Sequence, residues 1–259
     1  MTWERLTPLV TVGSIALFFA LGAIAPRNPP AVRWSDLRAN VLTGAGLYAV
    51  RLALQIGVAA PIAALGGGII PLDAVRAPIL QTLVALLLLD FTRYWVHRAD
   101  HRVGLLWNFH RVHHSTEHLD STAGLRMHVF DLIQLTAIPI VLFGLLFDAS
   151  SFAAPAIPIA LSVGGFFDAF EHANLRFTLR SPIARAWHAV FNNPLFHSWH
   201  HTRDGVKKDG NYGQTLTIWD RLFGSDVTES EPPELYGLDD SQTLQAGPLA
   251  MQLLRPRRR

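Results

Sequence analysis

The chain has 259 residues, of which half are hydrophobic and 16% are charged, and its formal net charge is +2. A mean hydropathy of +0.24 argues against a soluble protein, and the small net charge offers nothing typical of a nucleic-acid partner. The chain has no cysteine, which excludes disulfides and thiolate metal ligands.

The first part of the chain, residues 1–96, is expected to form three membrane helices. Residues 6–26 and 52–72 carry no charged side chain, and each run is long enough to cross a hydrocarbon core of about 30 Å. A shorter apolar run at 77–89 is the third. We interpret the first run as a retained helix and not a secretory signal, because Glu4 offsets Arg5 and leaves no basic leader.

The placement of basic residues predicts the orientation of these helices. Arg27, Arg33 and Arg38 lie between the first two runs, so the positive-inside rule puts the 27–40 loop in the cytoplasm. The third run then ends on the cytoplasmic side near His97. Two further apolar runs, 132–147 and 149–167, form a hairpin at 129–170 whose tip at 148–151 faces outward and whose second arm returns at His172. Both histidine-bearing regions are therefore expected at the cytoplasmic face.

These elements predict an all-α protein. We expect about four to five transmembrane segments, capped by a cytosol-facing, histidine-rich helical domain. Residues 1–96 form the membrane portion, 97–224 the catalytic region with its membrane hairpin, and 225–259 an acidic, turn-rich tail that is ordered at first and then frays.

All twelve histidines lie between His97 and His201, and most fall into three tight clusters. The clusters read H-x3-H from His97, H-x2-H-H from His110 and H-x2-H-H from His197. On a helix, residues three and four positions apart share a face, so each cluster is expected to aim two or three imidazoles at a common point. A structural zinc site needs only about four ligands, so this number of histidines predicts two metal ions.

A metal-bound histidine usually donates its second ring N–H to an acceptor. Six residues near the clusters are candidates for this role: Asp100, Glu117, Asp120, Asp168, Glu171 and Asn174.

Three stretches of the chain resemble the membrane fatty acid hydroxylase and sterol desaturase superfamily. The first, from Asp90 to Asp131, reads DFTRYWVHRADHRVGLLWNFHRVHHSTEHLDSTAGLRMHVFD. The second is EHANL at 171–175. The third is HSWHH from His197, followed by NYGQTLTIWDRLFG at 211–224. The resemblance covers roughly residues 90–224, and motif order, spacing and closing signature all agree.

The resemblance implies an integral membrane enzyme with a cytosol-facing di-iron centre that uses O2 to hydroxylate or desaturate a lipid. Zinc can replace iron in purified protein. Nine ligands carry over: His97, His101, His110, His113, His114, His172, His197, His200 and His201. His128, in an R-x-H position of bacterial members, is a tenth candidate. Asp168 stands where some members have a further histidine, so no histidine of this chain matches that coordination position. His118 and His188 match no ligand position, and we expect them beside the site or on the surface.

The implied partners are a membrane lipid, O2 and a separate electron donor, which is a ferredoxin, a cytochrome or a reductase. The lipid is expected to enter sideways from the bilayer through a tunnel. Four aromatic residues could line it, although core packing is the commoner role of such residues: Phe91, Tyr94, Trp95 and Trp107. Arg98, Arg102 and Arg111 either receive an acidic electron carrier or pair with carboxylates near the metals. The lipid class (fatty acyl, sterol-like, carotenoid or alkyl glycerol), the choice of hydroxylation or desaturation and the oligomeric state stay open.

Two other classes of protein compete with an oxygenase. A histidine-rich membrane protein that binds or transports metal would place some ligands near the middle of a span, whereas these clusters lie in polar segments at the ends of apolar runs. Hydrolytic zinc chemistry is disfavoured because the chain has no H-E-x-x-H motif and more histidines than such a site uses.

Overall fold

The structure, a computed structural model, describes residues 6–54, 57–58, 68–72, 74–148, 152–203, 207–238 and 250. Five long helices form its frame: α1 (Leu6–Ile24), α2 (Trp34–Leu54), α4 (Pro78–Arg102), α6 (Val129–Leu146) and α7 (Ala156–Glu171). Shorter helical segments complete it: α5 (Gly104–His110), η3 (His113–Ser115), η4 (Ala123–Leu125), α8 (Pro182–Val190), α9 (Pro194–His200) and α10 (Ile218–Leu222). Two short strands, β1 (Ile70–Pro71) and β2 (Phe147–Asp148), pair in parallel. The predicted helical fold class is confirmed.

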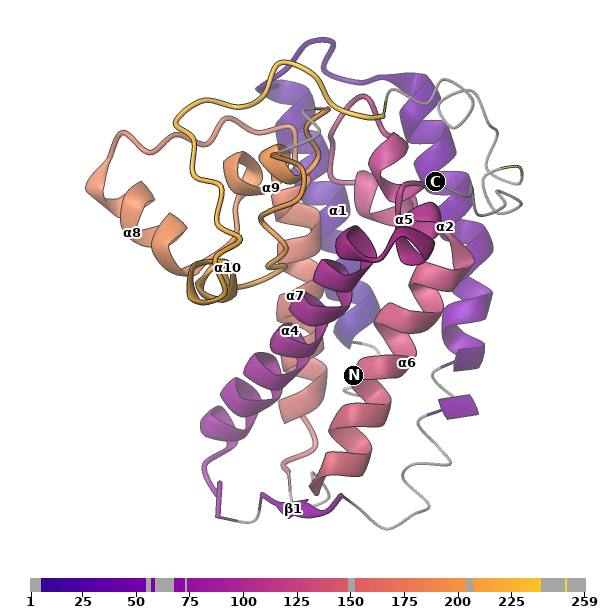
Figure 1. The fold of residues 1–259 in the computed structure, drawn as a ribbon, viewed down its shortest axis with the longest axis vertical. Helices are drawn as coiled ribbons and strands as arrows, with labels where there is room; N and C mark the ends of the chain where they lie inside the picture. Colours follow the sequence, from indigo (N-terminus) through magenta and orange to yellow (C-terminus); the bar gives the residue numbers. More distant parts are fainter. Residues whose placement is uncertain are drawn as a thin grey trace.

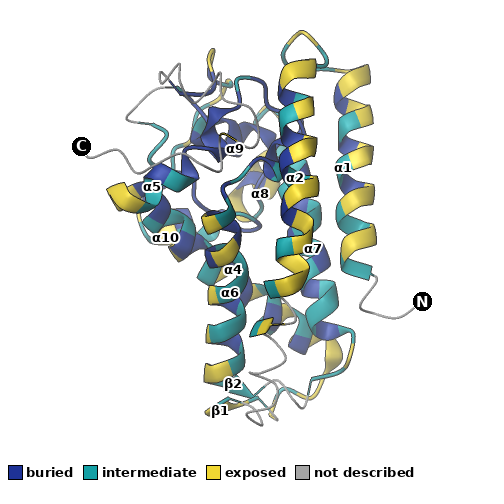
Figure 2. Cartoon of the chain, turned by 90° about the vertical axis from the view of Figure 1, so that its right-hand side faces the viewer, coloured by how far each residue is buried: buried dark blue, intermediate teal, exposed yellow. Residues whose placement is uncertain are grey.

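The long helices pack side by side in an order that differs from their order in the chain. Helix α1 contacts α7, α7 contacts α4, α4 contacts α6, and α6 contacts α2 (Figure 1). The core between α4, α6 and α7 is apolar and includes Ala85, Phe143 and Ala160. The long helices also have exposed faces (Figure 2), and these carry apolar side chains such as Leu9, Val12 and Leu142. A frame that is apolar on both sides suits a lipid environment.

Three of these helices are long and apolar enough to cross a membrane: α1, α4 and α6. They correspond to the predicted runs at 6–26, 77–89 and 132–147. Helix α7 covers part of the 149–167 run but has only 16 residues, and it is not among the three. Most of the 52–72 run lies outside the described residues, as do 149–151 at the predicted hairpin tip. The number of spans therefore stays a prediction.

Helix α2 differs from the prediction, which assigned residues 27–40 to a loop. The chain is already helical from Trp34, and the polar side chains of α2 explain why its hydropathy conceals a helix. Asp36 forms an ion pair with Arg126 at 2.5 Å, and Asn40 donates to Thr122 Oγ1 at 2.8 Å. Both side chains have polar partners inside the protein, so they do not prevent the helix from packing in the bundle.

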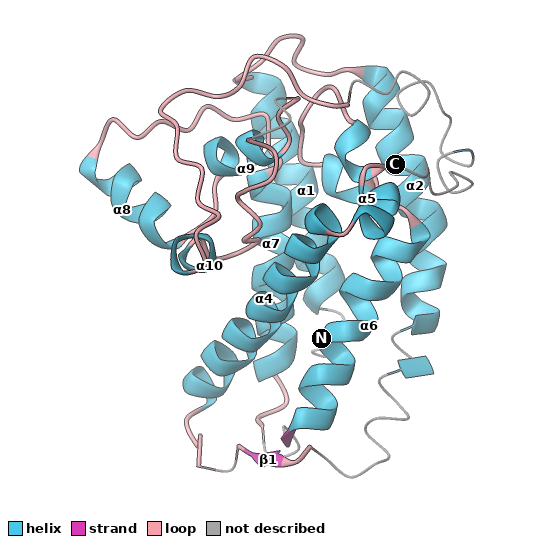
Figure 3. Ribbon diagram, in the orientation of Figure 1, coloured by secondary structure: helices cyan, strands magenta, loops and turns pink. Residues whose placement is uncertain are grey.

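Both histidine-bearing regions lie at one end of the long helices. The backbone N–H of Arg27 donates to the carbonyl of Asn174 at 3.0 Å, which joins the segment after α1 to the segment after His172. Strands β1 and β2 lie at the opposite end of the frame (Figure 3). The fold therefore gathers the histidines on the same side as the basic 27–33 segment. Which side of the membrane this is stays a prediction.

The described part of the predicted tail, residues 225–238, folds back over the histidine-bearing end. The Trp199 indole donates to the Glu231 carbonyl at 2.8 Å, and the Tyr236 side chain is buried. Residues 239–249 and the basic end at 251–259 lie outside the described part of the chain.

Candidate metal centre

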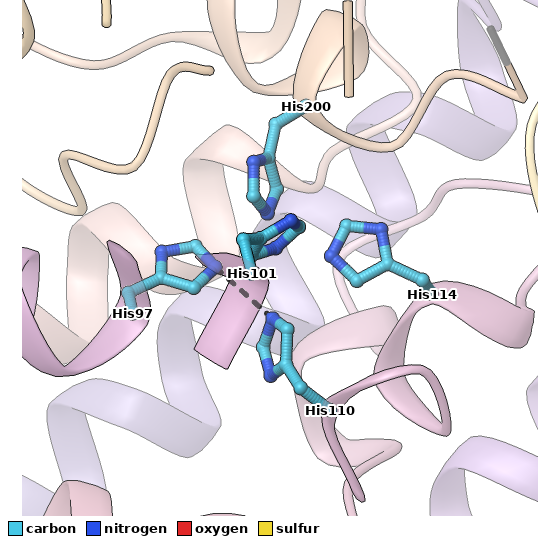
Figure 4. A group of neighbouring side chains, drawn as sticks. All are labelled: His97, His101, His110, His114 and His200. Atoms are coloured by element: carbon cyan, nitrogen blue, oxygen red, sulfur yellow. Dashed lines mark hydrogen bonds between the residues drawn. The ribbon is translucent and has the colours of Figure 1, made fainter. Parts of the chain in front are cut away.

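Two groups of histidines form the candidate centre. In the first, a ring nitrogen from each of five histidines lies within 4.8 Å of the others: His97, His101, His110, His114 and His200. Figure 4 shows these five rings converging from α4, from the segment that holds α5 and η3, and from α9. The second group satisfies the same criterion with four members: His113, His172, His197 and His201. The structure thus brings together nine of the ten predicted ligands.

The groups are adjacent. The rings of His114, in the first group, and His201, in the second, are stacked with centroids 4.4 Å apart. The chain also alternates between the groups, since His113 and His114 are neighbours in sequence but belong to different groups, as do His200 and His201. Two metal ions held here would therefore lie side by side, joined by short segments of backbone.

The division follows one rule of helix geometry. Within the three clusters, histidines four residues apart share a group: His97 with His101, His110 with His114, and His197 with His201. The pairs three residues apart, His110 with His113 and His197 with His200, are split between the groups. The expectation that each cluster serves one common point is therefore wrong for the two H-x2-H-H clusters. Adjacent residues on a helix point about 100° apart, so a cluster that ends in two histidines reaches two centres.

Backbone carbonyls fix the protonation of several rings. Four Nδ1 atoms lie at hydrogen-bonding distance from a carbonyl: His97 from Tyr212 O at 2.9 Å, His113 from Arg126 O at 3.1 Å, His172 from Asp168 O at 2.6 Å and His200 from Gly210 O at 2.8 Å. Because a carbonyl only accepts, each of these Nδ1 atoms carries the proton in the neutral ring. The Nε2 atom of each ring then presents a lone pair, which is the form that binds a metal.

These lone pairs face one another at short range. His172 Nε2 lies 3.3 Å from His113 Nε2, and both rings carry their proton on Nδ1. A hydrogen bond between the two Nε2 atoms is then impossible in the neutral state, and two lone pairs at this distance repel each other. A cation between them removes the repulsion. The Nε2 atoms of His101, His114 and His200 are buried without a hydrogen-bond partner, which fits the same role.

Burial keeps most of these rings neutral. It lowers the pKa of His113, His114, His197, His200 and His201 well below the ordinary value, and the neighbouring histidines lower it further. His110 differs. Burial lowers its pKa too, but hydrogen bonding to Asp131 and the negative charges of Asp131 and Asp100 outweigh this, so its pKa is raised. Neutral imidazole is the metal-binding form, so the five lowered groups stay competent ligands in mildly acidic solution.

Carboxylates approach four of the histidines. Asp131 Oδ2 lies 3.5 Å from His110 Nδ1, Asp209 Oδ1 lies 3.4 Å from His101 Nδ1, and Glu171 approaches both His172 at 3.8 Å and His197 at 3.7 Å. Sequence reasoning anticipated Glu171 and missed Asp131 and Asp209. Asp131 closes the first resembling stretch and lies three residues after His128, but no spacing rule marks it.

The other predicted neighbours have different partners. Asp168 approaches His172 mainly through its backbone carbonyl, and Asp100 accepts from the Gln134 amide. Asn174 pairs with the backbone of Asn28, Glu117 with Arg33 and Arg203, and Asp120 with Thr122. These last three side chains hold the loops around the centre and do not approach its histidines.

His128, the tenth candidate, lies outside both groups. Its Nδ1 accepts from the Phe130 N–H at 3.0 Å, which caps the start of α6, and its ring packs on Phe109. His118 and His188 also lie outside the groups, and both are buried, so the surface position considered for them is wrong.

The three arginines near the clusters are bonded to backbone carbonyls or a tyrosine hydroxyl. Arg98 donates to Tyr94 Oη and the Phe223 carbonyl, Arg111 donates to the Asn108 carbonyl, and Arg102 donates to the Asp209 carbonyl. Of the three, Arg102 is exposed. Docking of an acidic electron carrier thus remains a prediction that Arg102 fits best.

A cavity of about 280 Å³ lies against the histidines. One end is lined by histidines of both groups, including His97, His110 and His172. The other end runs between α1, α2, α4, α6 and α7 and is lined by apolar side chains that include Ile15, Leu47, Leu132, Leu135 and Leu161. The aromatic residues Phe91, Tyr94, Trp95 and Trp107 are not among the described residues that line it. The first three pack around Phe223, and Trp107 packs on His101.

Comparison with known proteins identifies the class. The sequence profile of the family described as "Fatty acid hydroxylase" matches residues 82–225, which is more than half of the chain. The chain belongs to this family, and the predicted family membership is confirmed. No solved structure matches it significantly.

Among similar proteins is the ornithine lipid hydroxylase OlsE of Rhizobium tropici, which is 28% identical over 262 residues, covering 92% of this chain and 70% of the relative. An alkylglycerol monooxygenase of Xenopus tropicalis is 34% identical over 152 residues, 58% of this chain and 31% of the relative. A Delta(7)-sterol 5(6)-desaturase of Leptosphaeria maculans is 28% identical over 136 residues, 52% of this chain and 34% of the relative. The chain thus spans about a third of the length of the last two.

Proposed function

We propose that this chain is a membrane-bound lipid oxygenase that holds two metal ions, iron in the active protein, with the nine grouped histidines as ligands. The observation that carries the proposal is the approach of His113 Nε2 to His172 Nε2 at 3.3 Å while both Nδ1 atoms donate to carbonyls. A cation bound between these two lone pairs would remove their repulsion. Family membership and the names of the relatives, which are hydroxylases, a monooxygenase and a desaturase, support oxidation as the chemistry.

The ligand set favours a borderline transition metal over magnesium or calcium, because imidazole is a poor ligand for hard cations. Iron bound here supplies redox chemistry with O2 and external electrons, and zinc replaces it without that chemistry. The chain's own contribution is to hold the rings. The carbonyls of Tyr212, Arg126 and Gly210 orient His97, His113 and His200, so these ligands need little rearrangement to bind.

The cavity is the proposed site of the lipid. Its histidine-lined end would receive the carbon that reacts, and its apolar end lies between helices whose outer faces suit a bilayer. Packing of α1, α2, α6 and α7 around this space would limit the access of bulk water to the reacting atoms, which protects a reactive oxidant. A lipid already dissolved in the membrane reaches such a site by moving sideways between helices.

The substrate classes remain those left open by the sequence: fatty acyl chains, sterol-like rings, carotenoids or alkyl glycerols. The relatives are named for an ornithine lipid, an alkylglycerol, a fatty acid and a sterol, so family membership does not choose among them. Hydroxylation and desaturation both stay open. The proposed arrangement places the centre at the cytoplasmic face, where a separate ferredoxin, cytochrome or reductase delivers two electrons per turnover. Residues 97–224 would form the catalytic region and 1–96 the membrane portion.

The test compares lipid extracts from cells that produce the wild-type protein, His110→Ala or His118→Ala. His118 is a matched control, because it is a buried histidine outside both groups. We expect a lipid that gains one oxygen or loses two hydrogens with the wild type and with His118→Ala, and its absence with His110→Ala. Purified protein loaded anaerobically with ferrous iron should consume O2 only with a reductant and the lipid.

The competing function is metal transport. Uptake of metal into vesicles by the purified protein, lost in His113→Ala, together with no lipid product and no O2 consumption, would overturn the oxygenase proposal.

A further inference from the structure

An arginine projects into the cavity from the membrane helix that carries the first two ligands. Arg93 lies in α4 and lines the cavity together with His97, one helical turn further along. An ionised side chain within an apolar span is costly unless it meets a partner, and such residues commonly mark a functional site. Arg93 is therefore expected to have a polar partner.

Within the described part of the chain, Arg93 forms no ion pair. Its Nη1 donates to Gln214 Oε1 at 3.1 Å, and Gln214 is neutral. A guanidinium has five N–H donors, so this bond leaves most of its hydrogen-bonding capacity for the cavity.

The carboxylates around Arg93 are bound to other donors. Asp90, one turn earlier on α4, accepts from the backbone N–H groups of Thr215 and Leu216 and from the Trp219 indole. Asp168 accepts from the Gln214 side-chain amide at 3.3 Å, so Gln214 stands between it and Arg93.

The two remaining carboxylates that line the cavity also face other groups. Glu171 accepts from the Asn192 amide and approaches His172, and Asp131 faces His110. The described carboxylates around Arg93 thus all face other groups, and none of them is a direct counter-ion.

The neighbouring helix leaves room for the guanidinium. A Cβ atom at Gly164 of α7 would lie 2.7 Å from Arg93 Nη1, so only glycine lets the guanidinium occupy this position without displacement. A second arginine, Arg51 of α2, lines the same cavity and is exposed, as is its neighbour Tyr48 one turn away. The cavity therefore reaches the surface at α2 beside a positive charge.

We propose that Arg93 binds an anionic oxygen of the lipid substrate, a carboxylate or a phosphate, and that Arg51 attracts the same group at the mouth of the cavity. The proposal rests on the proposed function in taking the cavity as the lipid site. The planar guanidinium can form paired hydrogen bonds with a carboxylate or a phosphate, and either group would be a direct counter-ion for Arg93. The substrate class is thus a lipid with an acidic group, in preference to a neutral sterol, carotenoid or alkyl glycerol.

The experiment measures equilibrium lipid binding to the purified, zinc-loaded full chain in phosphatidylcholine nanodiscs, where no turnover takes place. The probes are palmitate against methyl palmitate, and dioleoyl phosphatidic acid against dioleoylglycerol. We expect at least one acid to bind about tenfold or more tightly than its neutral analogue, the size of effect that a charge-assisted hydrogen bond gives. The pair that shows the difference identifies the group as carboxylate or phosphate.

Two variants test whether Arg93 binds the acidic group. Arg93→Gln should reduce the affinity for the acid to that for the neutral analogue. Gly164→Ala keeps the charge but displaces the guanidinium, and it should weaken acid binding several-fold even if Arg93→Gln fails to fold. The control is Arg185→Gln, which replaces an exposed arginine that does not line the cavity, and it should bind as the wild type does.

Equal binding of acid and neutral analogue by the wild type, or acid binding unchanged in both variants, would overturn the proposal. Because the zinc-loaded protein does not turn over, lipid binding is measured independently of the oxygenase activity. If acids bind through Arg93 but the iron-loaded protein consumes no O2, the oxygenase proposal fails and the binding site stands.

Discussion

His172 Nε2 lies 3.3 Å from His113 Nε2, although 59 positions separate the two residues in the chain. Each ring donates its Nδ1 proton to a backbone carbonyl, His172 to Asp168 and His113 to Arg126. The fold therefore aims two unprotonated nitrogens at one point, an arrangement that favours a bound cation.

Removing one ligand from the second group should release one metal ion. We expect His197→Ala to reduce the metal content from about two ions per chain to about one, because the second group would keep three ligands while the first keeps all five. Elemental analysis of the purified protein measures this. His188→Ala removes a buried histidine outside both groups and should leave the content unchanged. Loss of both ions in His197→Ala would mean that the groups do not bind independently.

Arg126 should be essential for stability. Its side chain is 2% exposed, it pairs with Asp36 and donates to Asn40 Oδ1 at 2.7 Å, and its own carbonyl accepts from His113. Arg126→Met removes the close, buried partner of Asp36 and leaves it only the longer ion pair with the partly exposed Arg33 at 3.7 Å, so we expect a loss of about 3 kcal/mol in the free energy of unfolding. Thermal unfolding in detergent measures the effect. Arg180→Met, at an exposed position, should change the unfolding temperature little.

The metal-free protein should lose stability as the pH falls below about 6.5. Burial lowers the pKa of five histidines, including His114 and His200, so in the folded state they stay neutral where the unfolded chain already binds protons. The unfolded state then binds more protons, and stability falls by up to about 1.4 kcal/mol per pH unit for each histidine.

His110 acts in the opposite direction. Its pKa is raised, so its contribution to stability is present at low pH and is lost as the pH rises through the folded-state pKa. One such group offsets only part of the effect of five. Unfolding temperatures of chelator-treated protein at pH 7.5 and 5.5 test the balance, and equal temperatures would contradict the prediction.

Asp131 should strengthen metal binding by the first group of histidines. It faces His110 at 3.5 Å and holds the ring that contacts His97 at 3.1 Å between the Nε2 atoms. We expect Asp131→Asn to weaken metal binding about 10- to 100-fold, the usual effect of removing a carboxylate behind a histidine ligand. Competition with a chelator measures the affinity. Glu231→Gln replaces an exposed carboxylate and should have no effect. An unchanged affinity in Asp131→Asn would show that Asp131 does not support metal binding through His110.

The sequence by itself determined the family, the identity of the histidines that converge, the apolar runs that became α1, α4 and α6, and the common end at which the two histidine regions meet. The family and its histidines follow from the resemblance of motifs along the chain, and the apolar runs follow from hydropathy, which is a property of neighbouring residues. The tertiary structure alone decided how the H-x2-H-H clusters divide, since that depends on the direction from which each helix approaches. It also decided which carbonyls orient the rings, because every residue has a carbonyl and none is marked in the sequence. The tertiary structure also revealed helix α2, whose polar residues concealed it in the sequence. It likewise showed that Arg93 has no direct counter-ion among the described residues, because the partner of a charged side chain depends on which distant segments pack around it.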